Sequence, residues 1–189
     1  VAQHLPAVAG FLMEKEIRML GSILEEPKRP FIAVLGGAKV SDKIKVLNNL
    51  VPKVNTLIIG GGMAFTFLAA QGYGVGRSLL EEDKIPVAKE IMQVAESRGV
   101  KLLLPVDVVV AQEATDKAVS QVVPVSAIPA AEMGLDIGPA TRKLYSEAIA
   151  GASTVLWNGP MGMFELPPFA AGTQAVAQAI ADSGSISVV

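Results

Sequence analysis

Apolar segments of this sequence run repeatedly into glycine, and this pattern constrains the fold more than any other feature. FIAVL at 31–35 is followed by Gly36-Gly37, TLIIGGG at 56–62 ends in three glycines, and STVLWNG at 153–159 ends in Gly159. Amphipathic stretches separate these segments. Buried strands that alternate with helices are typical of a parallel sheet covered on both sides. The sequence therefore predicts an α/β fold.

In more detail, the pattern predicts a doubly wound, mostly parallel sheet with helices on both faces, a Rossmann-like three-layer sandwich. Helices are expected at 7–24, 41–50, 63–71, 84–98, 139–152 and 168–183, and strands at 31–35, 56–62, 101–111, 120–128, 153–159 and 185–189. Ser41 or Asp42 is expected to cap the second helix. The segment 132–139 is expected to be a connecting loop in which Asp136 caps nearby N–H groups, and Asp107 to be a buried, structurally satisfied aspartate.

Composition limits the possible functions. The chain has 189 residues, 51% of them hydrophobic, and a net charge of −2, which argues against a broad nucleic-acid surface. It has no cysteine and a single histidine, His4, so thiolate and histidine-cluster metal sites are excluded and a cytoplasmic setting is expected. No apolar stretch is long enough to span a membrane. The start at Val1, with no signal-peptide pattern, leads us to expect a fragment or a processed chain.

The glycines mark the expected ligand edge. In open parallel sheets, ligands bind outside the carboxyl ends of the strands. The glycine-terminated strands should all open toward that edge, and glycine lets backbone approach a ligand closely. We therefore expect a ligand crevice there.

The segment LGGAKVSDKI at 35–44 carries Lys39 and Lys43, four residues apart. If a helix begins near Ala38, both lysines share a face near its N-terminus, which suits a polyphosphate. A strand, a turn and two solvated lysines explain the same pattern, and spacing alone leaves both interpretations open. The Walker pattern of P-loop proteins is not matched.

Two further segments could form a nucleotide site. In IIGGGMAFTF at 58–67, the glycines would allow backbone to lie flat against a planar ring, or would permit close helix–strand packing. VLWNGPMGMFE at 155–165 is rich in Gly, Pro and apolar residues. There Asn158 offers an amide, Met163 an apolar wall for a base, and Glu165 a carboxylate for ribose hydroxyls. A loop closed by core aromatics is the alternative, although such loops more often carry function.

Together the segments GGAKVSDKI, IIGGGMAFTF, LPVD, MGLDIGP and WNGPMGMFE, in this order, resemble the C-terminal nucleotide-binding domain of the phosphoglycerate kinase family. The resemblance covers essentially the whole chain, and its first and last motifs are the most specific. Met163 stands where valine is commoner, a change that keeps an apolar wall.

The resemblance implies a function and roles for particular residues. The family transfers a phosphoryl group between 1,3-bisphosphoglycerate and ADP, giving 3-phosphoglycerate and Mg-ATP, with two lobes that close by a hinge. Lys43 should contact the nucleotide phosphates, and Lys39 should be catalytic by steadying the phosphoryl group in flight. The other implied nucleotide-binding residues are Gly60, Gly61, Gly134 and Leu135 around adenine, Asn158 at the phosphates, Pro160 and Met163 near the base and ribose, and Glu165 at the ribose hydroxyls.

The resemblance also implies how the chain is divided into domains and which parts of the enzyme it lacks. Residues 1–30 should be the interdomain helix and connector, and residues 31–189 a nucleotide-binding α/β domain that is incomplete at its C-terminal end. The Mg²⁺ ligand of Mg-ATP or Mg-ADP should be an aspartate beyond residue 189, so no metal site is expected within the chain. Its partners should be adenine nucleotide and the N-terminal lobe of the same enzyme, with no nucleic acid or membrane. The full enzyme should be a cytoplasmic monomer.

Three interpretations follow. In the first, the chain is a nucleotide lobe that binds ADP or ATP weakly and is inactive alone. In the second, it is a non-catalytic assembly or folding fragment that recruits a complementary piece through its sheet edge and N-terminal helix. The third, an NAD-binding domain, lacks the glycine fingerprint and the acidic residue after the second strand.

Overall fold

A computed structural model describes residue 8 and residues 10–189, with the backbone alone for residues 16–20, 22 and 23. The helices are α1 (Phe11–Glu25), α2 (Ile44–Leu50), α3 (Ala64–Ala70), α4 (Ile85–Ser97), α5 (Pro139–Ala150) and α6 (Ala171–Asp182). Short 3-10 turns are η1 (Glu82–Lys84), η2 (Val125–Ala127) and η3 (Pro167–Phe169). The strands are β1 (Phe31–Leu35), β2 (Thr56–Ile59), β3 (Lys101–Leu103), β4 (Asp107–Ala111), β5 (Ser120–Pro124), β6 (Met133–Ile137), β7 (Thr154–Asn158) and β8 (Ile186–Val188).

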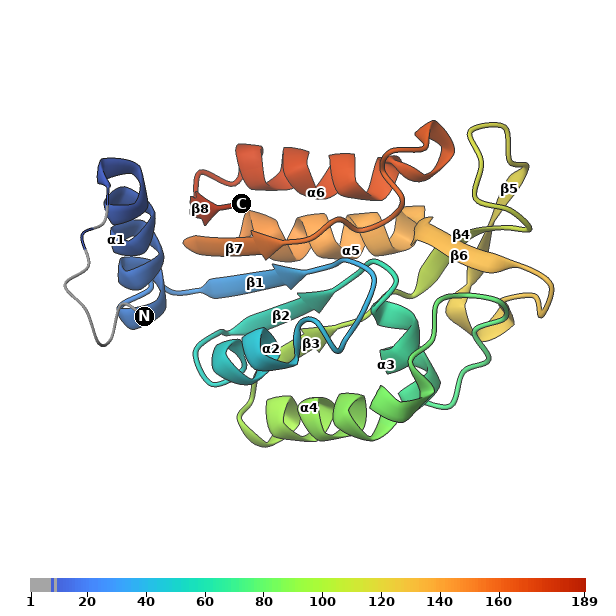
Figure 1. The fold of residues 1–189 in the computed structure, drawn as a ribbon, viewed down its shortest axis with the longest axis horizontal. Coiled ribbons are helices and arrows are strands. Elements are labelled where there is room, and N and C mark those ends of the chain that lie inside the picture. The colour runs from blue at the N-terminus through green and yellow to red at the C-terminus, as the bar shows by residue number, and fades with distance from the viewer. Residues whose placement is uncertain (1–7, 9) are drawn as a thin grey trace.

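The main sheet is parallel throughout, with the strand order β3-β2-β1-β7-β8. Helices cover both of its faces (Figure 1). The predicted doubly wound α/β fold is therefore confirmed.

The side chains of β1 point alternately to the two faces of the sheet, which explains why helices cover both faces. Phe31, Ala33 and Leu35 belong to one core, shared with α2, α3 and α4. Ile32 and Val34 belong to a second core on the opposite face, shared with α5 and α6. Successive side chains of a strand point to opposite faces, so a fully apolar strand needs two helical layers.

A second, antiparallel sheet has the order β5-β4-β6 and departs from the sequence prediction. The predicted strand 101–111 is in fact two strands in different sheets, because the chain leaves β3 before Pro105 and resumes pairing at Asp107. The predicted loop 132–139 contains strand β6, so that prediction was wrong. The predicted strand 120–128 ends at Pro124 and continues as η2.

Two helix starts also differ from expectation. Helix α2 begins at Ile44, without a side-chain cap, so neither Ser41 nor Asp42 caps it and Lys39 lies in the preceding loop. Of the helix predicted at 7–24, the described part is α1, starting at Phe11. Residues 7 and 9 and His4 lie outside the described residues.

The start of α5 is fixed by a buried carboxylate. Asp107 accepts hydrogen bonds from the backbone N–H groups of Ala140 (2.9 Å) and Thr141 (2.7 Å). It also accepts one from the Thr141 hydroxyl, at 2.6 Å. The prediction that Asp107 is a structurally satisfied buried aspartate is thus confirmed, and these bonds lock α5 to β4.

Candidate functional site

A cavity of about 490 Å³ lies between the edge of the main sheet at the carboxyl ends of its strands and strand β6. One side is formed by glycines that follow β1 and β2, and another by the loop after β7. The lining residues are Gly37, Ala38, Gly61, Gly62, Ala64, Phe65, Arg77, Leu79, Pro105, Val108, Ala114, Met133, Gly134, Leu135, Asp136, Ile137, Pro160, Met161, Gly162, Met163 and Glu165. The lining is mostly apolar, with few charged groups, as is usual for a small-molecule site.

Close backbone packing at the strand ends explains the glycines there. Gly61 has a positive φ of 65°. A Cβ atom at Gly61 would lie 2.6 Å from the Gly37 backbone and 2.8 Å from the Pro160 carbonyl oxygen. Gly37 N donates to Pro160 O at 2.9 Å, and Met63 N donates to Gly37 O at 3.0 Å. Glycine is therefore required for the loops after β1, β2 and β7 to meet at one edge.

The residues predicted for base and ribose binding are largely brought together. Those lining the cavity are Gly61, Gly134, Leu135, Pro160, Met163 and Glu165. Gly60 does not line it, because it packs against Met161, whose Sδ atom occupies the space where a Cβ would stand. Gly134 lies directly against the ring of Phe65, which leaves no room there for a side chain.

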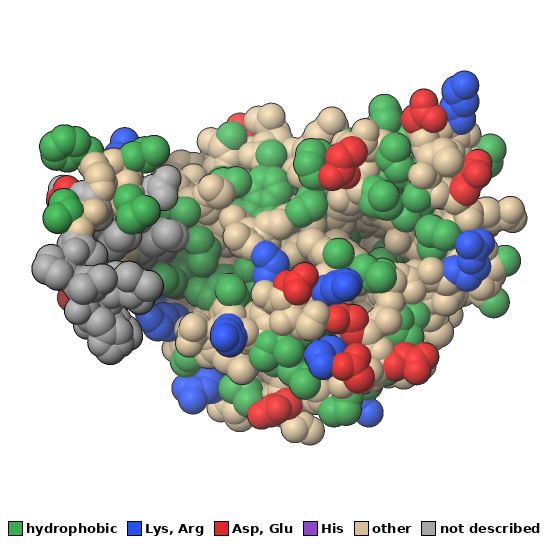
Figure 2. Space-filling view, in the orientation of Figure 1, with side chains coloured by type: hydrophobic (Ala, Val, Ile, Leu, Met, Phe, Trp, Pro, Cys, Tyr) green, Lys and Arg blue, Asp and Glu red, His purple; other side chains and the backbone are tan. Residues whose placement is uncertain are grey.

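The residues predicted for phosphates lie beside the cavity rather than in its lining. Lys43 Nζ donates a hydrogen bond to Asn158 Oδ1, which joins the loop after β1 to the end of β7. Lys39 is exposed, and its ammonium group has no partner among the residues that the structure describes. It directly follows Ala38, a lining residue. Acidic and basic side chains are interspersed on the face drawn in Figure 2.

Asp136 is a buried carboxylate in the cavity wall, and its predicted capping role is confirmed. Its Oδ1 accepts a hydrogen bond from Ile137 N, and its Oδ2 accepts one from Gly172 N in the first turn of α6. Burial raises the pKa of Asp136 to about 6, although these two hydrogen bonds and the charge of Arg142 act in the opposite direction. The cavity wall therefore contains a carboxyl group with a pKa of about 6.

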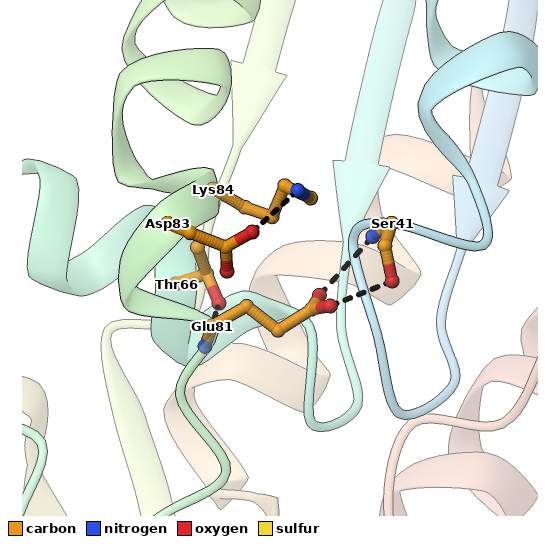
Figure 3. A network of polar contacts seen from close by, with 5 residues as sticks. All are labelled: Ser41, Thr66, Glu81, Asp83 and Lys84. Carbon is orange, nitrogen blue, oxygen red and sulfur yellow. Dashed lines mark hydrogen bonds and ion pairs between the residues drawn. The ribbon is translucent and has the colours of Figure 1, made fainter.

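A second carboxylate, Glu81, contacts the loop that carries the lysines (Figure 3). It accepts hydrogen bonds from the hydroxyl and the backbone N–H of Ser41. Partial burial alone would raise the pKa of Glu81, but the hydrogen bonds from Ser41 and Val40 outweigh it and leave the pKa below its usual value. The charged form of Glu81 is thus the favoured one.

Sequence reasoning missed several lining residues. Phe65 lies within IIGGGMAFTF and could have been inferred from that motif. Arg77 donates to the carbonyl oxygens of Gln112 (3.2 Å) and Ala131 (3.3 Å), and Leu79 lies nearby in the chain. No local pattern marks these two residues, because contacts with distant loops bring them to the cavity.

The described part of the chain contains neither a membrane-spanning helix nor a candidate metal cluster. No described helix combines the length and apolarity needed to cross a bilayer. Nor do the described residues include a group of His, Cys, Asp and Glu side chains that could hold a metal ion.

Comparison with known proteins gives a consistent result. A family model described as "Phosphoglycerate kinase" matches residues 1–189. The chain is 59% identical over 189 residues to the phosphoglycerate kinase of Moorella thermoacetica, covering 100% of this chain and 48% of that protein. It is 58% identical over 192 residues to that of Chloroflexus aggregans, again covering 48% of the relative. The chain thus spans about half the length of the curated relatives it matches.

Solved structures agree in fold. Phosphoglycerate kinase from Coxiella burnetii superposes with a TM-score of 0.92 at 45% identity, covering 95% of this chain and 46% of that one. The enzyme from Pyrococcus horikoshii OT3 gives a TM-score of 0.81 at 32% identity, covering 97% and 47%.

Proposed function

This chain belongs to the phosphoglycerate kinase family, and from that premise we propose that it is the nucleotide-binding lobe of the enzyme. The complete enzyme would transfer a phosphoryl group between 1,3-bisphosphoglycerate and ADP, giving 3-phosphoglycerate and ATP in glycolysis. The lobe alone would bind ADP or ATP weakly and would not catalyse transfer. We assign residues 31–189 to the domain itself and residues 1–30 to the interdomain helix and connector.

The observation that carries this proposal is the cavity at the glycine-lined edge. Its apolar walls, between Gly61 on one side and Leu135 and Met163 on the other, suit a planar base. Glu165 in the same lining supplies a carboxylate for ribose hydroxyls. Gly37 and Ala38 continue the lining toward Lys39. A nucleotide with its base in the cavity would therefore carry its phosphates toward the lysine loop, which we define as residues 36–43.

We assign the phosphate contacts to two lysines and one amide. Lys43 and Asn158 already share a hydrogen bond, so a phosphate at Lys43 also lies within reach of the Asn158 amide. Lys39, which is exposed, is the cation available to a phosphoryl group in transit. Fixed positive charge that meets negative charge developing in the transition state is the main means of phosphoryl-transfer catalysis.

The described residues do not by themselves make a metal site. We propose that Mg²⁺ enters with the nucleotide and finds its protein ligand, an aspartate, outside this chain. We also propose that the acceptor is held by the N-terminal lobe, and that the complete enzyme is a cytoplasmic monomer.

Calorimetric titration of the chain with ADP tests the proposal. Wild type should bind ADP, and Lys43→Ala and Glu165→Ala should each lose most of that binding. Lys143→Ala and Glu96→Ala are matched controls, since both side chains are exposed on helices outside the cavity lining. Unchanged ADP binding in both site variants would overturn the site assignment.

A second candidate, a folding or assembly fragment, is favoured by one observation. Phe11, Leu12 and Met13 of α1 are 93%, 72% and 58% exposed. In Figure 1, α1 stands apart from the sheet, beyond the ends of β1 and β7. The fragment role predicts that adding the complementary part of the enzyme restores kinase activity, and failure to restore it would remove this candidate.

A further inference from the structure

The lysine loop (residues 36–43) carries two flexible side chains, and Val40 between them is buried in the core. At its start, Gly37 bonds to Pro160 and Met63. At its end, Lys43 N donates to Val40 O at 2.8 Å, which closes a turn around Ser41. Helix α2 begins only after this turn and has no side-chain cap. The turn therefore needs support from outside the loop.

Glu81 provides that support with both of its carboxylate oxygens. Ser41 Oγ donates to Oε1 at 2.6 Å, and Ser41 N donates to Oε2 at 3.1 Å. The two residues lie 40 positions apart, so the pair ties separate segments of the chain together. Hydrogen bonds to a charged group are about twice as strong as neutral ones.

Glu81 is itself hydrogen-bonded to helix α3, which follows the second glycine-terminated strand. Its backbone N–H donates to Thr66 Oγ1 at 3.3 Å. Thr66 is 1% exposed and belongs to α3, which follows the glycines after β2. Figure 3 shows Glu81 between Thr66 and Ser41, with its carboxylate directed at Ser41. The loop after β1 is thereby linked to the helix after β2.

The partners of Glu81 also matter electrostatically. The hydrogen bonds to the carboxylate of Glu81 come from neutral donors, chiefly those of Ser41, and not from Lys39 or Lys43. Within the described residues, the ammonium group of Lys39 has no ion-pair partner. The carboxylate can thus fix the backbone of the loop while leaving the lysine charges available to phosphate.

We propose that Glu81, acting through Ser41, is a positioning residue that holds the lysine loop in its phosphate-binding arrangement. The inference rests on the proposed function, since it concerns the same phosphate subsite. It predicts that Glu81 affects phosphate binding and leaves base binding alone.

The experiment compares ADP with adenosine in calorimetric titrations of the chain. Adenosine reports the base and ribose contacts, so the ratio of the two affinities isolates the phosphates. Ser41→Ala keeps the backbone bond and should lower ADP affinity by about three- to tenfold, and Glu81→Ala by about tenfold or more. Adenosine affinity should not change. The double variant Ser41→Ala/Glu81→Ala should be no weaker than Glu81→Ala, because both changes remove one interaction.

Asp83→Ala is the matched control. Asp83 is an exposed carboxylate two residues from Glu81, and its side chain pairs with Lys84 instead of the loop (Figure 3). It should leave both affinities unchanged. An equal loss of ADP and adenosine binding in the Glu81 variant, or an unchanged ratio, would overturn the proposal.

Amide hydrogen exchange separates this inference from the proposed function. The Ser41 amide should exchange faster in Glu81→Ala than in wild type, while α4 keeps its protection. If wild type binds neither ligand, the proposed function fails, but faster exchange at Ser41 would still support the positioning role. Unchanged exchange at Ser41 would overturn it even if Glu81→Ala binds ADP poorly.

Discussion

Lys43 and Asn158 are 115 positions apart in the chain, yet Nζ of the lysine donates a hydrogen bond to Oδ1 of the asparagine. The sheet explains the contact. Lys43 lies in the loop that follows β1, and Leu35 at the end of β1 is the register partner of Asn158 in the adjacent parallel strand β7. The amide holds the lysine at the sheet edge without neutralising its charge. A carboxylate in the same place would form an ion pair with it.

The first prediction follows from that difference. Asn158→Asp should lower ADP affinity by about tenfold or more, because the new carboxylate competes for Lys43 and repels phosphate. Adenosine affinity should not change. Gln93→Glu on α4 adds the same charge at an exposed site and should leave ADP binding intact. Calorimetry decides between the outcomes, and an ADP affinity equal to that of wild type would contradict the proposed phosphate contact.

The second prediction concerns the base. Gly134→Ala places a methyl group against the Phe65 ring, which must then shift within the cavity wall. ADP and adenosine affinities should therefore fall together, by about tenfold, because the displaced ring takes up space that the base of either ligand would occupy. By contrast, Asn158→Asp, which changes the phosphate site, should lower the affinity for ADP alone.

Gly74→Ala is the control for Gly134→Ala, because a Cβ at Gly74 meets nothing within 4 Å. It should bind both ligands as wild type does. A Gly134→Ala protein that is folded by circular dichroism and binds adenosine normally would show that the base lies elsewhere.

The sequence was sufficient for the features that depend on local pattern. FIAVL is apolar at every position, and its residues do alternate between two helical layers. Glycines at 60–62 and 159 do mark strand ends that meet at one edge. Both inferences need only strand periodicity and the small size of glycine.

Features set by long-range pairing could not be predicted in this way. Strand β6 contains Gly134 and Asp136, which disfavour strands, and it forms because β4 pairs with it. Pro105 lies inside a single strand in the sequence prediction, whereas the chain changes sheets there. The bond from Ser41 to Glu81 spans 40 positions and has no local signature.

The third prediction tests the bonds at the start of α5. The Thr141 hydroxyl accepts from Val106 N (3.0 Å) and Asp107 N (3.1 Å), and Thr141 is fully buried. Thr141→Val keeps the shape but leaves these donors unpaired, so it should lower the free energy of unfolding by about 1–3 kcal/mol. Thr115→Val, in an exposed loop, should change it by no more than about 0.5 kcal/mol. Urea denaturation measures both, and equal effects would show that the buried bonds are not the cause.

The fourth prediction concerns the pH dependence of stability. The pKa of Asp136 is raised by burial from 3.8 to about 6 in the folded chain. Between these values the folded chain holds a proton that the unfolded chain has released. The free energy of unfolding contributed by Asp136 therefore falls as pH rises through this window, and the loss is complete above about pH 6. A shift of about two units corresponds to about 3 kcal/mol.

Asp136→Asn removes this titration while keeping one acceptor oxygen for the amides of Ile137 and Gly172. The variant loses a hydrogen bond at every pH, but it should gain stability relative to wild type by up to about 3 kcal/mol between pH 4 and pH 7. Urea denaturation of both proteins at several pH values gives this difference, and Asp116→Asn, in an exposed loop, shows what an Asp→Asn change contributes elsewhere. Because other carboxylates titrate identically in wild type and variant, their contributions cancel. A difference that stays constant across the window would mean that Asp136 is already ionised at pH 4, and that its hydrogen bonds from Ile137 and Gly172 outweigh its burial.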